Sequence, residues 1–143
     1  MLERIIFDKY RCFKHASLSC RCLTIIVGKN NAGKSTVIEA LRLVAYVAKH
    51  YKTNNYKTPP AELHLPLVQK GLLVPINPID IDLGTIVYQY MDRDGYYATI
   101  TAIFSNKTKI VVYCCNSSVF ANVYDSFGVL IASKAKANVV QIP

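Results

Sequence analysis

Apolar and polar residues follow different periods along the chain, and each period predicts a different element. Glu3–Phe7 has the β-branched and aromatic content of a strand, Arg11–His15 is a polar turn, and Ala16–Ser19 suits a short second strand. Cys22–Val27 reads CLTIIV, a continuous apolar run typical of strands that are covered on both faces. The first part of the chain is therefore predicted to contain three strands.

From Ser35 the apolar period becomes helical. Apolar residues recur there at spacings of three and four, at Val37, Ala40, Leu41, Val44 and Ala48. We expect a helix from about Ser35 to about Tyr51, largely buried because it is apolar nearly all round. Residues 53–82 are then predicted to be an irregular insertion, because repeated prolines interrupt any regular pattern.

From Leu83 onward the period is two. The predicted strands are Thr85–Tyr90, Tyr97–Phe104, Lys109–Cys115, Val119–Tyr124 and Val129–Ala132. Short turns separate them, so neighbouring strands should be antiparallel, with Ala98, Ile100, Ala102 and Phe104 on one face. We interpret the chain as a single lobe. Residues 1–52 hold the first strands and the helix, 53–82 the insertion and 83–143 an antiparallel β-subdomain, and we expect the lobe to be incomplete at its C-terminal end.

Composition narrows the class of protein. The chain has 143 residues, of which 52% are hydrophobic and 18% charged, as in a packed globular domain. No run approaches the roughly 18 apolar residues of a membrane span, and the charged N-terminal segment has no signal-peptide core, so we expect a cytoplasmic protein. The five cysteines form no CxxC pair, which argues against a disulfide framework or a zinc site. The net charge of +8 favours polyanionic partners.

A polar loop bounded by glycines joins the apolar run to the helix. It reads Gly28-Lys29-Asn30-Asn31-Ala32-Gly33-Lys34-Ser35 and fits the phosphate-loop pattern GxxxxGK[ST]. The glycines let the backbone wrap a phosphate, and the N–H groups form an anion-binding nest at the start of the helix. Lys34 would reach the β- and γ-phosphates, the Ser35 hydroxyl would bind Mg²⁺, and Thr36 would add a hydroxyl near the α-phosphate. We therefore expect ATP with Mg²⁺ as the ligand.

The segment Leu2–Leu43 resembles the N-terminal end of the ATPase heads of the SMC, RecF and OLD-nuclease group, which are ABC-type ATPases and include AAA-labelled P-loop ATPases. The matching pieces are IIF at Ile5–Phe7, YRCF at Tyr10–Phe13, LTIIVGKNNAGKST at Leu23–Thr36 and IEALRL at Ile38–Leu43. The later meander is similar to the antiparallel β-subdomain of such heads.

The resemblance implies roles for three further residues. Arg11 would reach back to the nucleotide, although it could equally be a solvated turn arginine. Asn30 would shape the loop and approach the γ-phosphate, or serve only as a turn former. Gln141 is a candidate for the glutamine that contacts Mg²⁺ near the border between subdomains, with Gln89 and Gln69 as further candidates, and the alternative for each is an ordinary polar residue.

Heads of this group hydrolyse ATP with a Walker B strand ending in paired acids, a signature motif and a switch histidine. The sequence has no apolar run ending in two acids and no LSGGQ-like string, and its histidines lie in the wrong part of the chain. We therefore assign no catalytic residue to this chain.

Together these features predict an α/β fold: a P-loop NTPase half-domain with its Walker A helix packed on a mixed sheet, plus the antiparallel meander. The chain would bind ATP and Mg²⁺, and hydrolysis would need a C-terminal ATPase lobe or a second head, with a homodimer in the full protein. DNA would be a further partner, in DNA transactions or defence, and no membrane would be involved. The alternatives are a complete small P-loop phosphotransferase, or a non-catalytic regulatory module with a vestigial phosphate loop.

Overall fold

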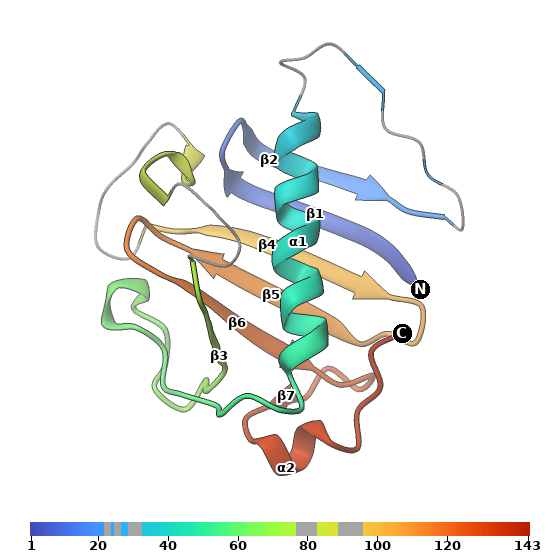
Figure 1. Ribbon diagram of the computed structural model, residues 1–143, viewed down its shortest axis with the longest axis vertical. Coiled ribbons are helices and arrows are strands. Elements are labelled where there is room, and N and C mark those ends of the chain that lie inside the picture. Colours follow the sequence, from blue (N-terminus) through green and yellow to red (C-terminus); the bar gives the residue numbers. More distant parts are fainter. Residues whose placement is uncertain (22–23, 25–26, 29–32, 77–82, 89–95) are drawn as a thin grey trace.

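The described strands form one antiparallel sheet. The structure, a computed structural model, describes residues 1–21, 24, 27–28, 33–76, 83–88 and 96–143. Within these residues the spatial order is β2-β1-β4-β5-β6-β3, and β7 also pairs with β6 (Figure 1). The strands are β1 Leu2–Tyr10, β2 Phe13–Ser19, β3 Leu72–Val74, β4 Ala98–Phe104, β5 Lys109–Cys114, β6 Val119–Tyr124 and β7 Leu130–Ile131. Every described pair is antiparallel, so the mixed sheet that we expected is not found in this part of the chain.

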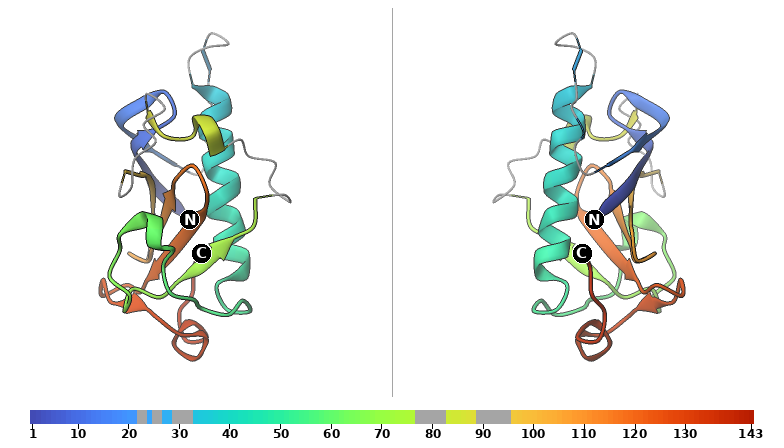
Figure 2. Two further views of the ribbon diagram at one scale, coloured as in Figure 1. Left: turned by 90° about the vertical axis from the view of Figure 1, so that its left-hand side faces the viewer. Right: turned by 90° about the vertical axis from the view of Figure 1, so that its right-hand side faces the viewer.

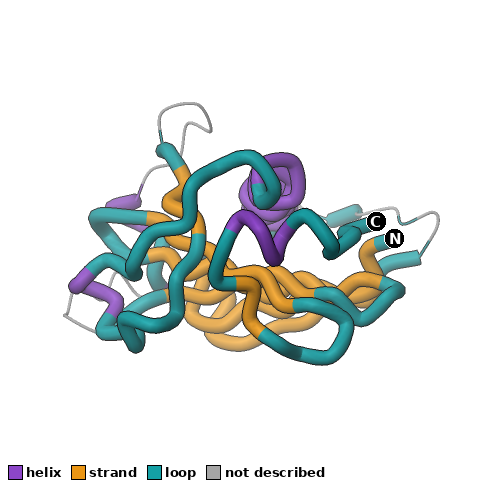
Figure 3. Tube along the Cα trace, turned by 90° about the horizontal axis from the view of Figure 1, so that it is seen from below, coloured by secondary structure: helices purple, strands orange, loops and turns teal. Residues whose placement is uncertain are grey.

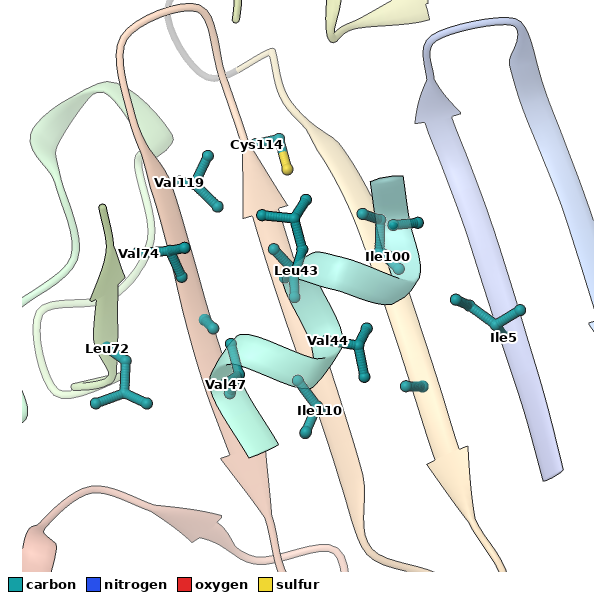
Figure 4. Packing of buried hydrophobic residues seen from close by; sticks show 14 of the residues in the cluster. Ile5, Leu43, Val44, Val47, Leu72, Val74, Ile100, Ile110, Cys114 and Val119 are labelled. Atoms are coloured by element: carbon teal, nitrogen blue, oxygen red, sulfur yellow. The ribbon is translucent and has the colours of Figure 1, made fainter. Parts of the chain in front are cut away.

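One long helix, α1 (Lys34–His50), lies across one face of this sheet (Figures 1 and 3). It matches the helix predicted from about Ser35 to about Tyr51. Its buried residues point toward the sheet, where they meet side chains from several strands (Figure 4), and they are Val37, Ala40, Leu43, Val44 and Val47. Each of the valine and leucine side chains contributes about 1.5–3 kcal/mol on burial. The expectation of a largely buried helix was wrong, because only this stripe is covered and Ile38 on the other side is 50% exposed.

The period-two pattern of the second half is confirmed where the chain is described. Ala98, Ile100, Ala102 and Phe104 are all buried on the face of β4 that α1 covers. The strand predicted at 119–124 is found with those bounds as β6, and those predicted at 109–115 and 129–132 are found, shortened, as β5 and β7. The strand predicted at Thr85–Tyr90 was wrong for its described residues. A 3-10 helix, Leu83–Thr85, occupies its start, and Val87 makes a single bridge to Tyr10. A short helix, α2 (Lys134–Ala137), was not predicted.

Part of the predicted insertion belongs to the sheet. After a 3-10 helix at Ala61–Leu63, β3 pairs with β6. The side chain of Asn122, fully buried on β6, anchors the chain just before β3. It accepts a hydrogen bond of 2.6 Å from Gln69 Nε2 and donates to the carbonyl oxygens of Gln69 and Lys70, at 3.3 and 3.1 Å. Because β1 also pairs with β4, residues 1–52 and 83–143 contribute to the same sheet as this part of the insertion.

The two ends of the chain lie side by side (Figure 2). The Met1 ammonium donates to Ser105 Oγ at 3.1 Å, and the neighbouring Asn106 side chain donates to the Gln141 carbonyl at 2.6 Å. The Tyr51 hydroxyl, at the C-terminal end of α1, donates to the Val140 carbonyl at 2.7 Å. Among the described residues, no helix is long and apolar enough to cross a membrane.

Candidate functional site

The candidate site is centred on the N-terminus of α1. Gly33 is the N-cap residue, and its φ of 87° is a backbone conformation that glycine adopts without steric cost. Gly33 has no side chain to cap the first turn, and the first turn contains no acidic residue. The first N–H groups of a helix have no acceptor within the helix and carry partial positive charge. This end of α1 is therefore suited to bind an anion.

Lys34 begins the helix and points back along the loop. Its ammonium donates to the carbonyl oxygen of Gly28, the first residue of the phosphate-loop pattern. Ser35 is exposed and Thr36 is half-buried, so the helix start presents one ammonium and two hydroxyl groups together. Lys29, Asn30, Asn31 and Ala32 lie outside the described residues. Most of the strand predicted at 22–27 also lies outside the described residues. Thr24 and Val27 are described there; both are exposed, and neither belongs to a strand.

The turn between β1 and β2 packs directly against this helix start. A Cβ atom built on Gly33 would lie 2.7 Å from Cζ of Phe13 and 3.3 Å from Sγ of Cys12. A Cβ atom there would force the tip of the Phe13 ring to shift, so the close approach favours glycine here, as does the positive φ. The structure thus brings together two motifs that are separate in the sequence, the YRCF turn and the phosphate loop.

Arg11, at the tip of the same turn, is held by three groups. Its Nε and Nη2 atoms donate to the two carboxylate oxygens of Glu39 on α1, at 2.6 and 2.8 Å, in a bidentate ion pair. Its Nη1 donates to Thr85 Oγ1 at 2.6 Å. The Arg11 backbone has a φ of 48°, and its N–H donates to the Ile86 carbonyl at 2.8 Å. Arg11 therefore joins the turn, the helix and the segment 83–88.

The ion pair is mostly sheltered from water. The side chains of Arg11 and Glu39 are 19% and 20% exposed. Burial disfavours the charged guanidinium, yet the hydrogen bonds and charge of Glu39 outweigh it, so the pKa of Arg11 lies above its ordinary value. The Tyr10 hydroxyl also donates to Glu39, and burial, together with the nearby Cys114 and Glu39, raises the pKa of Tyr10 well above its usual range.

Gln141 lies far from the other predicted site residues. Its backbone is fastened beside Tyr51, at the C-terminal end of α1, whereas Ser35 is at the N-terminal end. A helix of 17 residues is about 25 Å long, so the structure does not bring Gln141 together with Ser35 around one metal ion. Gln69 is engaged with Asn122, as described above, and Gln89 lies outside the described residues.

Glu39 and Thr85 are site residues that sequence reasoning missed. Glu39 is the single acidic residue in the sequence of α1, on a helix that is otherwise apolar and basic. An isolated acid in such a helix is a signal that a cation must lie nearby, since a partly buried carboxylate needs a partner. Thr85 carried no signal, because it was assigned to a strand.

Other groupings in the described residues offer no second site of this kind. No cluster of three or more His, Cys, Asp or Glu side chains that could hold a metal ion is found there. Among the described residues, Cys12, Cys20, Cys114 and Cys115 are free cysteines. His15 lies 3.8 Å from Asp8 on an exposed surface, and the His50 ring packs on Tyr46.

Comparison with known proteins gives one family. Residues 1–140 match the family model described as the AAA ATPase domain, and the match includes the phosphate loop, α1 and the antiparallel sheet. No curated protein matches the chain.

Proposed function

The chain belongs to the AAA ATPase domain family, and we propose that it binds ATP with Mg²⁺ at the N-terminus of α1. The observation that carries the proposal is the helix start at Gly33, which has no side-chain cap and is followed directly by Lys34, whose ammonium reaches the Gly28 carbonyl, and by the exposed Ser35. The ammonium and the backbone N–H groups suit the β- and γ-phosphates, and the hydroxyl suits the metal ion. Asn30, Asn31 and Ala32 would complete the loop around the phosphates.

A binding experiment tests the proposal. Equilibrium binding of a fluorescent ATP analogue should depend on Mg²⁺ and be lost in Lys34→Ala, because the ammonium and its contact with the Gly28 carbonyl are both removed. Lys49→Ala is the matched control, since Lys49 is exposed in the last turn of the same helix, away from the site. Equal binding by Lys34→Ala and the wild-type chain would refute the proposal.

We further propose that hydrolysis needs a second lobe, from the same natural chain or from another polypeptide. In the described part of the site the acid is Glu39, and it accepts hydrogen bonds from Arg11 and Tyr10. The outer stripe of α1 is exposed at Ser35, Ile38, Arg42, Ala45 and Lys49, and the apolar Val27 before it is 83% exposed. A second lobe packed there would cover Ile38 and Val27 and could supply the missing acids. A steady-state ATPase assay on this chain alone should read near background, and robust turnover would contradict this part of the proposal.

The resemblance to SMC, RecF and OLD heads supports a role in DNA transactions or defence, with two heads joined through ATP. The net charge of +8 suits a polyanionic partner. The test is a salt-dependent shift of a DNA fragment by the full protein, compared with and without ATP, and a lack of any DNA binding at low salt would refute this role.

A complete small phosphotransferase is less well supported. Such enzymes alternate helices with parallel strands, whereas all described strand pairs here are antiparallel. A vestigial phosphate loop would show as absent ATP binding in the experiment above.

A further inference from the structure

We propose that Glu39 is a positioning residue for nucleotide binding: it fixes the guanidinium of Arg11 beside the first two turns of α1. The inference rests on the proposed function, because its readout is the affinity for ATP. It concerns a residue outside the phosphate-loop pattern, on the second turn of α1.

The contacts of the turn place Arg11 close to the helix start. Its neighbours Cys12 and Phe13 lie against Gly33, the N-cap of α1. Glu39 is five residues after Lys34, which is about 7.5 Å along the helix axis, and helical side chains lean toward the N-terminus. The Arg11 charge is thus held alongside the first two turns of α1, on the side where the β1–β2 turn packs.

The contacts of Arg11 hold its guanidinium in one orientation, unlike those of a surface ion pair. A bidentate bond to Glu39 fixes the plane of the guanidinium, and the bond from Nη1 to Thr85 fixes its far edge. The exposed pair between Lys107 and Glu3, at 3.8 Å, has no comparable support. A preorganised cation near an anionic ligand avoids the entropy cost of ordering a long side chain upon binding.

Positioning and simple charge predict opposite results for Glu39→Gln. Removal of a negative charge near a triphosphate should tighten binding if charge alone matters. If Glu39 positions Arg11, its loss releases the guanidinium, because an amide offers one acceptor and turns a donor toward Arg11. We expect ATP binding to weaken roughly five- to tenfold, about the net effect of losing one ordinary hydrogen bond.

The experiment measures ATP affinity for five variants alongside the wild-type chain: Glu39→Gln, Thr85→Val, Glu3→Gln, Arg11→Met and the Arg11→Met/Glu39→Gln double variant. Thermal unfolding of each is the check on folding. Thr85→Val removes the bond to Nη1 at constant side-chain volume and should weaken binding roughly two- to fivefold. Glu3→Gln is the matched control, since it removes the same charge from the exposed pair with Lys107 and should leave affinity unchanged. In an Arg11→Met background, adding Glu39→Gln should tighten binding, because only the charge effect remains.

The outcomes separate the two proposals. If the wild-type chain binds ATP, and both Glu39→Gln and Thr85→Val bind it as tightly or more tightly, the role of Glu39 is overturned while the proposed function stands. If Glu39→Gln does not fold, Thr85→Val decides the matter by itself. Absence of ATP binding by the folded wild-type chain would overturn the proposed function, and the role of Glu39 with it.

Discussion

Replacement of Gly33 by alanine tests the contact that joins the β1–β2 turn to the start of α1. The substitution adds one methyl group at a residue with a φ of 87°, and that methyl group would lie 2.7 Å from the ring of Phe13. Two separate costs follow. The left-handed backbone is strained for alanine, and the Phe13 ring must move away from its place beside Phe7, where the ring centroids are 5.1 Å apart.

The size of the effect can be worked out from these two costs. The left-handed conformation costs a non-glycine residue about 1–2 kcal/mol, and overpacking at a closely packed contact adds about 1–3 kcal/mol. A total of about 3 kcal/mol is expected. Unfolding entropy is about 2.1 cal/mol/K per residue near 60 °C, which gives about 0.3 kcal/mol/K for 143 residues. The melting temperature should therefore fall by about 10 °C.

Gly128 provides a matched control for the backbone term. Its φ is 79°, and nothing lies within 4 Å of a Cβ atom built on it. Thermal and urea unfolding of Gly128→Ala should therefore show the conformational cost of about 1–2 kcal/mol alone. The remaining loss in Gly33→Ala should be recovered in part by Phe13→Leu in the same chain, which shortens the opposing side chain. Equal losses in Gly33→Ala and Gly128→Ala would refute the packing of the turn on the helix start.

Two further predictions concern the core. Burial raises the pKa of the Cys114 thiol, so the folded chain holds its proton while the unfolded chain loses it above about pH 9, and stability should fall by up to about 1.4 kcal/mol per pH unit above that pH. Cys114→Ala should flatten this slope between pH 9 and 10 in urea unfolding, and an unchanged slope would exclude Cys114 as its source. Asn122→Leu should cost about 2–4 kcal/mol, because the carbonyl oxygens of Gln69 and Lys70 lose their donor. The exposed Asn138→Leu should cost less than about 1 kcal/mol in the same unfolding assay, and a similar loss in both would contradict this account of the Asn122 network.

The local pattern of apolar residues was sufficient to predict an element where one of its faces is buried and the other is not. The alternation from Ala98 to Phe104 and the apolar spacing after Val37 each match the period of their element, so β4 and α1 were predictable. The phosphate-loop residues were identified by their pattern, and Gly28 and the residues from Gly33 to Ser35 are the described ones; their role in nucleotide binding stays a prediction.

Pairing between distant segments was not predictable from local pattern. Leu72–Val74 is too short to show a period, and it becomes a strand because β6 offers it an edge. Thr85 and Val87 have side chains typical of strands, but they do not form a ladder of strand pairs. Thr85 accepts a hydrogen bond from Arg11, and Val87 makes a single bridge to Tyr10. The bond between Arg11 and Glu39 joins residues 28 positions apart on two elements, and no window along the sequence contains both signals.

The place of β1 in the sheet has a consequence for how the chain folds during synthesis. β1 pairs on one side with β2, its neighbour in sequence, and on the other with β4, where Leu2 lies opposite Phe104. At about 5–20 residues per second, a ribosome needs roughly 5–20 s to extend the chain from Tyr10 to Phe104. Throughout that interval the β1–β2 hairpin lacks its second partner, and a two-stranded hairpin alone is marginally stable in water. The edge of β1 that later pairs with β4 therefore stays unpaired for seconds, and in this window a chaperone would find its binding site.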